Sequence, residues 1–197
     1  MKFTTSYSPV TMKFASMTEA ELSDFYNWFI VNLPYFLDEL IQAVWKTPGF
    51  EGWSADFSPE SLDMLGEWFA ARVESRDLSP EEIDELKSEI TSAVEIATWE
   101  LTSETKSLAV FIGMYYGQVA IKNNPKLSWK QVKANMKLAD FGQPVISGPG
   151  VVPINPVRVA NVLACGIARG SKTGSRLRGS YDNWSKLVVP KGSVNKL

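Results

Sequence analysis

The chain has 197 residues, of which 45% are hydrophobic and 21% charged, and this length and composition fit one globular domain with a buried core. Its formal charge of −2 hides an asymmetry, because residues 1–119 hold 20 Asp/Glu against 7 Lys/Arg, whereas residues 120–197 hold 2 against 13. The absence of histidine and the single cysteine exclude histidine-activated nucleophiles, zinc sites that need imidazole and an internal disulfide, and we expect neither a cofactor nor a metal site.

The first predicted helix follows an N-terminal arm, residues 1–17. Thr18 and Glu21 form a capping-box pattern, and apolar residues at helical spacing come after it. We expect Pro34 to interrupt this helix, because proline removes a backbone donor and clashes with the preceding turn. A second apolar stripe then predicts a helix that ends at residues 47–49.

Two serine–proline pairs predict the next two helix starts. Ser58 and the proline after it place a cap before a first-turn proline, and apolar spacing continues to Val73. Ser79 and the proline after it repeat the pattern, and an apolar stripe predicts a helix of about five turns through Leu101. The acidic beginning of this helix suits the positive end of the helix dipole.

A helix that is apolar on most faces is predicted from Ser107 to Lys122, with Asn-Asn-Pro at residues 123–125 ending it. Because an element that is apolar nearly all round has to be surrounded by others, we expect this to be the central helix. Gly113 and Gly117, four residues apart, would let another element approach its backbone closely.

Glycine and proline accumulate in residues 125–155, which favours short extended or β segments. Residues 145–147 and 151–154 flank a Gly-Pro-Gly sequence and predict a small hairpin. Residues 129–132 are a candidate third strand.

Helical patterns return at the C-terminal end. Asn155 and the proline after it predict the start of a helix that Gly170 ends, and apolar spacing from Leu177 to Val188 predicts a last amphipathic helix. We expect residues 190–197 to form a flexible tail. The predicted fold is therefore mainly α: a compact multi-helix domain over residues 1–197, with a buried central helix and a small β-hairpin appendage.

Three features bear on location. The first ten residues lack a basic segment followed by an apolar one, so we expect no secretory signal. The longest apolar stretch, residues 108–121, is shorter than the roughly 20 residues needed to span a bilayer. A single cysteine, Cys165, is consistent with a reducing compartment. We expect a cytoplasmic protein that does not bind a membrane.

The acidic half supplies the first candidate binding surface. A strongly acidic helix face favours fast, salt-sensitive recognition of a basic protein partner. The candidate partner-binding patch consists of Glu81, Glu82, Asp84, Glu85 and Glu89. The alternative interpretation of such a charge cluster is an ordinary solvated helix face.

The basic half supplies the alternative surface. Clustered cations bind phosphates, and an exposed aromatic ring among them can stack a base, so RNA or single-stranded DNA is the alternative partner. The candidate residues are Trp129, Lys130, Lys133, Arg169, Lys172, Arg176 and Arg178. The acidic overall pI near 5.3 and the lack of a nucleic-acid motif weigh against it. The lysines are equally interpreted as a surface that complements the acidic helices of the same molecule.

Two weaker possibilities remain open, a carboxylate-dependent enzyme and a small-ligand site. Glu95, Glu100 and Glu104 lie near Trp99 and would have to converge on a cleft to act as acid and base or to bind magnesium. Tyr115, Tyr116 and Gln118 are candidates for a pocket between helices, although aromatic residues at such positions usually form core. The Gly-Ser-Lys-Thr sequence at residues 170–173 lacks the spacing of a phosphate-binding loop and is interpreted as an interhelical turn.

One group of short sequences occurs from Tyr115 onward: Tyr115-Tyr116-Gly117-Gln118, Asn123-Asn124-Pro125, Trp129, Gln143-Pro144-Val145 and Asn155-Pro156. In these residues the chain resembles uncharacterised bacterial helical proteins, some of toxin-immunity type. These short sequences form no specific motif and assign no functional residue. The resemblance implies an inhibitor-like protein, which agrees with the charge pattern, so we expect a non-enzymatic protein that binds a basic partner in preference to an enzyme.

Overall fold

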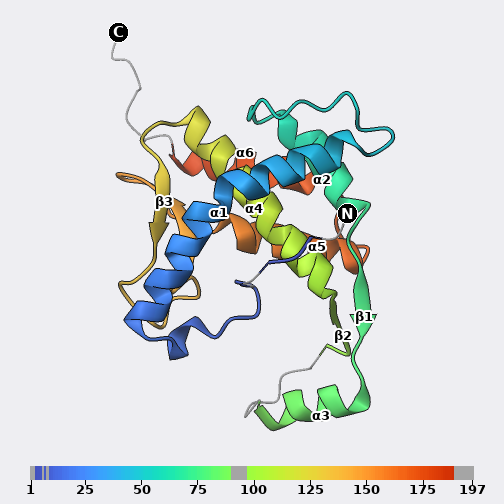
Figure 1. Ribbon diagram of the computed structural model, residues 1–197, viewed down its shortest axis with the longest axis vertical. Coiled ribbons are helices and arrows are strands. Elements are labelled where there is room, and N and C mark those ends of the chain that lie inside the picture. The colour runs from blue at the N-terminus through green and yellow to red at the C-terminus, as the bar shows by residue number, and fades with distance from the viewer. Residues whose placement is uncertain (1–2, 6, 8, 90–96, 189–197) are drawn as a thin grey trace.

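Helix α4 (Ser103–Asn123) lies at the centre of the molecule, where α1 (Glu19–Trp45) crosses it and α5 (Pro156–Ala168) packs along it (Figure 1). The computed structural model describes residues 3–5, 7, 9–89 and 97–188. Within these residues six α-helices and two small antiparallel sheets form a compact, mainly α fold, which confirms the predicted fold class.

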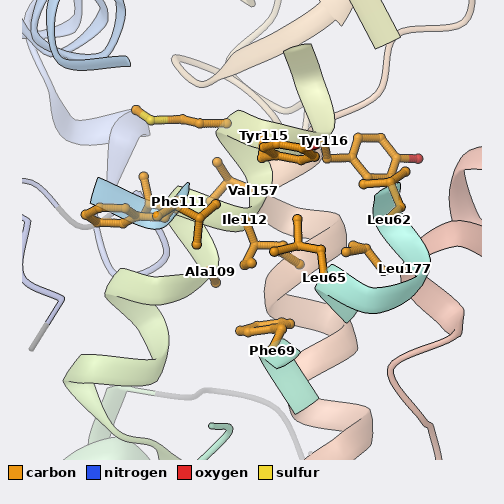
Figure 2. Close-up of a cluster of buried hydrophobic side chains, with 14 of the residues drawn as sticks. Leu62, Leu65, Phe69, Ala109, Phe111, Ile112, Tyr115, Tyr116, Val157 and Leu177 are labelled. Carbon is orange, nitrogen blue, oxygen red and sulfur yellow. The ribbon is translucent and has the colours of Figure 1, made fainter. Parts of the chain in front are cut away.

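The central helix is surrounded by apolar side chains on almost every side. Phe111, Ile112, Tyr115 and Tyr116 are fully buried on it, and they meet Leu65 and other side chains of α2 (Ser61–Ala70) in the core that Figure 2 shows. Burying a large apolar side chain contributes about 1.5–3 kcal/mol relative to leaving it exposed. The other helices therefore pack mainly around the apolar surface of α4.

Two glycines of α4 permit close packing, as their spacing predicts. A Cβ atom built on Gly113 would lie 2.6 Å from the Val157 Cα atom at the start of α5, and one built on Gly117 would lie 2.1 Å from the Trp129 ring. Cβ atoms do not approach other atoms so closely. The hydrogen atom at each position thus allows a neighbouring element to contact the α4 backbone.

Helix α1 begins as predicted, with Thr18 and Glu21 exchanging capping-box hydrogen bonds. The expectation that Pro34 would interrupt it is wrong, since α1 continues from Glu19 to Trp45 with Pro34 inside. Pro34 is exposed, so water can satisfy the carbonyl group that loses its helical partner there. Buried residues before and after the proline, Phe29 and Leu37 among them, hold both parts of the helix against the core.

The starts of the other body helices agree less closely with the predictions. Helix α2 begins at Ser61, so the prediction that Ser58 caps a helix starting at the next residue is wrong by two residues, although the Ser58 hydroxyl accepts a hydrogen bond from the Ser61 N–H. Helix α4 begins at Ser103, four residues before the predicted Ser107, and Thr102 caps it. Helix α5 begins as predicted, where the Asn155 side chain accepts a hydrogen bond from the Arg158 N–H (3.0 Å). Gly170, with φ of 68°, ends the α5 segment, and α6 (Arg176–Val188) follows and packs against α2 and α5.

One predicted helix is substantially shorter than its apolar stripe. Helix α3 covers Pro80–Glu89, but Trp99–Leu101 form strand β2, so the prediction of a helix through Leu101 is wrong. Strand β2 pairs in antiparallel register with β1 (Ser75–Asp77), a pairing that periodicity within one segment does not reveal. In Figure 1 this two-stranded ribbon carries α3 away from the helical body.

The glycine- and proline-rich region forms the second sheet. Strand β3 (Ser128–Gln131) pairs with β4 (Pro144–Ser147), so the candidate third strand is the main partner of β4. An isolated antiparallel bridge joins Ile146 to Ile154, which is what remains of the predicted hairpin. Val145 and Ile146 are buried against the body.

The N-terminal arm is less regular than the helical body. In the N-terminal arm a short 3₁₀ helix, η1 (Phe14–Ser16), and the buried rings of Phe3 and Phe14 contact the helices. The expected tail, residues 190–197, lies outside the described residues.

Candidate functional site

The predicted acidic patch belongs to a projection that we call the acidic arm, which consists of β1, α3 and β2. Its base is fixed to the start of α4 by Thr105, which is 1% exposed. The Glu74 N–H donates to the Thr105 hydroxyl (2.9 Å), and that hydroxyl donates back to the Glu74 carbonyl group (3.1 Å). Leu101, at the end of β2, is buried in the same region. The arm therefore begins on a well-anchored base.

An arginine clamp sets the direction of α3. Arg76 on β1 donates two hydrogen bonds to the Glu82 carboxylate (3.0 and 2.7 Å) and also contacts Glu100 on β2. The Ser79 N–H donates to Glu82 (2.8 Å), while the Ser79 hydroxyl accepts from the Glu82 N–H (3.2 Å), which completes a capping box. The hydrogen bonds from Arg76 and then from Ser79 lower the pKa of Glu82 to about 2. Glu82 is therefore hydrogen-bonded within the arm, to Arg76 on β1 and to Ser79 at the helix cap.

The other described carboxylates of the patch face solvent. Glu81, Asp84 and Glu85 are exposed, and a hydrogen bond from the Ser79 side chain lowers the pKa of Glu81. Asp84 lies 3.1 Å from Lys87, but both side chains are largely exposed, so this ion pair is weak. The Glu89 side chain lies outside the described residues.

Helix α3 also carries uncovered apolar surface. None of its described side chains is buried, and Leu86 is 37% exposed. Ile83, three residues earlier on the same face, is half-buried. The acidic arm thus presents carboxylates beside a leucine that the body of the protein leaves accessible.

The lysine-rich segment presents a second charged surface. Five exposed lysines occur between the end of α4 and the loop after β3, and none of them forms an ion pair with a carboxylate of the described residues. They are Lys122, Lys126, Lys130, Lys133 and Lys137. Lys122 lies over the Phe57 ring (4.5 Å), and the Lys133 amino group lies 3.2 Å from the Ser23 hydroxyl.

Trp129, the expected stacking aromatic, points toward the body. Its ring makes an edge contact with Phe29 (centroids 5.0 Å apart) and lies on Gly117. Its indole nitrogen is buried with no hydrogen-bond partner among the described residues. Trp129 therefore anchors β3 to α1 and α4, and its ring is packed against them instead of projecting beside the lysines for a base to stack on.

The second basic group does not form one surface. Arg178 is tied to Glu60 (3.0 Å) and Asp63 (3.5 Å) of the α2 region and to Asp182 of its own helix (2.8 Å). Arg169 lies over the Trp99 ring, 5.3 Å from its centroid. Lys172 and Arg176 instead border a cleft between α5 and α6. The structure therefore divides the predicted nucleic-acid set into separate environments.

The two charged halves of the sequence remain distinct after folding. Arg178 joins them through Glu60 and Asp63, whereas the other ion pairs between described residues stay within one half. The pairs of the acidic half include that of Lys106 with Glu100. Among the described residues, the five lysines between α4 and the loop after β3 form no ion pair with a carboxylate of the acidic arm.

Of the residues considered for an active site, Glu95 lies outside the described residues and Glu104 is exposed. Glu100 is held between Arg76 and Lys106, which lower its pKa, the Lys106 hydrogen bond most. The Tyr115 hydroxyl lies 2.9 Å from the Ser61 hydroxyl in the core, and burial raises the pKa of Tyr115 to about 12. Burial also raises the pKa of Tyr116. In the part of the chain that the structure describes, no group of three or more acidic or cysteine side chains is arranged to hold a metal ion.

Comparisons with protein-family models, curated proteins and solved structures found no match to this chain. Among the described residues, no helix combines the length and apolar character that crossing a membrane requires.

Proposed function

We propose that this protein is a non-enzymatic binding protein whose acidic arm recognises a basic protein partner. The observation that carries the proposal is the position of α3, which projects from the body with no described side chain buried (Figure 1). The helix holds five Asp/Glu residues and one lysine. A projecting negative element attracts cationic partners before contact and so increases their association rate.

The local structure prepares the arm for this role. An isolated helix of ten residues is marginal in water, so α3 depends on its cap, on the Arg76 clamp and on whatever it contacts. Arg76 occupies Glu82 and leaves Glu81, Asp84 and Glu85 facing outward. A clamped helix loses less conformational entropy on binding than a mobile one would.

The apolar residues of the arm supply the remaining contact. A partner that covers Leu86 and the accessible part of Ile83 would bury surface that the body leaves open. Charge would then set the rate and orientation of binding, while the apolar contact would add affinity. An inhibitor of toxin-immunity type that blocks a basic protein would bind in this way.

Affinity capture with charge-reversed variants tests the proposal. The immobilised full chain is exposed to lysate from the cell that makes it, beside the variant Glu81→Lys/Asp84→Lys/Glu85→Lys. We expect a basic protein that the wild type retains at low salt and releases at high salt, and that the variant does not retain.

The control variant is Asp24→Lys/Asp38→Lys/Glu67→Lys, which reverses three exposed carboxylates on α1 and α2. It changes the net charge equally and should retain the partner. Equal retention by both variants, or no protein retained by the wild type, would contradict the proposal.

The lysine surface supports a second candidate function, which is binding of RNA or single-stranded DNA. The observation that favours it is the set of exposed lysines that pair with no carboxylate of the described residues, Lys126, Lys130 and Lys137 among them. Because the Trp129 ring is packed against Phe29, such binding would depend on phosphate contacts, with little preference for sequence and a steep salt dependence.

A further inference from the structure

The helices α5 and α6 and the segment before them enclose a cleft of about 470 Å³, which we call the α5–α6 cleft. Its volume lies within the range of small-ligand sites, roughly 300–1,000 Å³. One wall is apolar and includes Val159, Val162 and Leu163 of α5. Lys172 and Arg176 also line the cleft, together with Arg158 and Asp140.

The charges of the cleft are not balanced. Arg158 pairs with Asp140 (3.0 Å), and Asp140 also accepts a hydrogen bond from Asn155 (2.9 Å). Lys172 and Arg176 form no ion pair with a carboxylate of the described residues. The cleft therefore keeps two positive charges that nothing in its lining compensates.

The position of Lys172 is fixed by the turn that carries it. The backbone N–H groups of Ser171 and Lys172 both donate to the Gly166 carbonyl group (2.9 and 3.1 Å). The Lys172 side chain lies across Gly166, where a Cβ atom would come within 2.4 Å of the Lys172 Cδ atom. The turn itself is held to α2 through Gly174, whose missing side chain lets it contact the Gly66 backbone. The turn backbone that carries Lys172 is thus held in place by its contacts with α5 and α2.

Apolar surface lies next to these cations. Val162 is 50% exposed, although it belongs to the apolar wall of the cleft. A ligand that covers the wall and reaches both cations would need an apolar group and a doubly charged end.

We propose that the α5–α6 cleft binds a small organic phosphate, a phosphate monoester with an apolar group. A phosphate monoester carries close to two negative charges near neutral pH, which matches Lys172 and Arg176, and the arginine fork suits phosphate oxygens. Its apolar group would lie on the Val159–Val162 wall. Side chains hold the phosphate here, because the turn N–H groups that a phosphate-binding loop would offer are already bonded to Gly166. The cleft is separate from the acidic arm and does not depend on its function.

Isothermal titration calorimetry of the full chain with phenyl phosphate tests this proposal. We expect a dissociation constant below about 1 mM, with inorganic phosphate and phenylsuccinate each binding at least about tenfold more weakly and benzyl alcohol not at all. No binding of phenyl phosphate at millimolar concentration would overturn the proposal. Equal affinity for inorganic phosphate would overturn the role of the apolar wall, and equal affinity for phenylsuccinate would overturn the assignment to phosphate.

Substitutions of cleft residues test whether phenyl phosphate binds in the cleft. Lys172→Gln and Arg176→Gln should each weaken phenyl phosphate binding about tenfold or more, because each removes a charge-assisted hydrogen bond. Val162→Asp should weaken it at least as much by adding a negative charge to the wall. Lys186→Gln is the control, because Lys186 is exposed on α6 but does not line the cleft, and its affinity should stay within about twofold. Unchanged affinity in both Lys172→Gln and Arg176→Gln would overturn the site.

Discussion

The contact between α4 and α5 predicts how much one added methyl group, at Gly113, should change the free energy of unfolding. In Gly113→Ala the new methyl group would lie 2.6 Å from the Val157 Cα atom, 2.7 Å from its nitrogen and 2.8 Å from its Cγ2 atom. Two of these are backbone atoms, so no rotamer change relieves the clash and the helices have to separate. Overpacking of this kind costs typically 1–3 kcal/mol, and we take about 3 because backbone is involved.

Helix propensity acts in the opposite direction. Alanine is favoured over glycine inside a helix by about 1 kcal/mol, which leaves a net destabilisation of about 2 kcal/mol. Gly179 in α6 is the matched control, since a Cβ atom there meets nothing within 4 Å. Gly179→Ala should therefore stabilise the protein by about 0.5–1 kcal/mol.

Urea unfolding followed by tryptophan fluorescence measures both changes. With a slope of about 2 kcal/mol per molar urea, the unfolding midpoint of Gly113→Ala should fall by about 1 M, whereas that of Gly179→Ala should rise. An unchanged or higher midpoint for Gly113→Ala would refute the reasoning that close backbone contact fixes glycine at this position.

Three further predictions concern the charged surfaces and their supports. Trp129→Ala should lower the free energy of unfolding by about 3 kcal/mol, because the ring fills space against Phe29 and Gly117, and urea unfolding should show it. Lys126→Gln/Lys130→Gln/Lys133→Gln should reduce binding of a labelled single-stranded oligonucleotide at low salt, measured by fluorescence anisotropy; no binding by the wild type would dismiss the nucleic-acid candidate. The Glu82 carboxyl group should titrate near pH 2 by NMR and nearer its ordinary value in Arg76→Met. Since folding lowers the pKa of Glu82, the ionised Glu82 carboxylate should stabilise the arm above about pH 4.5, and this stabilisation should be lost as the pH falls toward 2. Faster amide exchange in the arm at low pH would be the readout. Equal titration of Glu82 in the wild type and in Arg76→Met would contradict the clamp.

Patterns that depend on neighbours in the chain predicted much of the fold. The apolar surface of α4, the caps at Thr18 and Asn155, and the close approach at Gly113 were all predictable from spacing and side-chain chemistry. Pro34 was misleading because its effect depends on exposure, which the sequence does not give. There the solvent-facing position lets the helix continue.

Features that need distant partners were not predictable. Strand β2 follows an apolar stripe that also fits a helix, and only its pairing with β1 decides its conformation. The inward orientation of Trp129 depends on α1 and on Gly117.

The candidate sites divide in the same way. The exposure of Glu81, Asp84 and Glu85 was predictable because acidic residues near the start of a helix usually face solvent, although the hydrogen bonds from Arg76 to Glu82 were not. Arg158 was missed as a neighbour of Lys172 and Arg176, because the cleft brings together the start of α5 and the start of α6. The sequence could have indicated the cleft only through neighbouring basic residues, and Arg158 is distant in sequence from Lys172 and Arg176.

The association rate of the captured partner tests the role of the acidic arm most directly. Stopped-flow mixing with the wild type should give a rate constant that falls at least about tenfold between low and high salt. The variant Glu81→Lys/Asp84→Lys/Glu85→Lys should associate at least about tenfold more slowly at low salt and approach the wild type at high salt, whereas Asp24→Lys/Asp38→Lys/Glu67→Lys should remain close to the wild type. Equal low-salt rates for the wild type and the arm variant would show that the partner does not bind through the acidic arm.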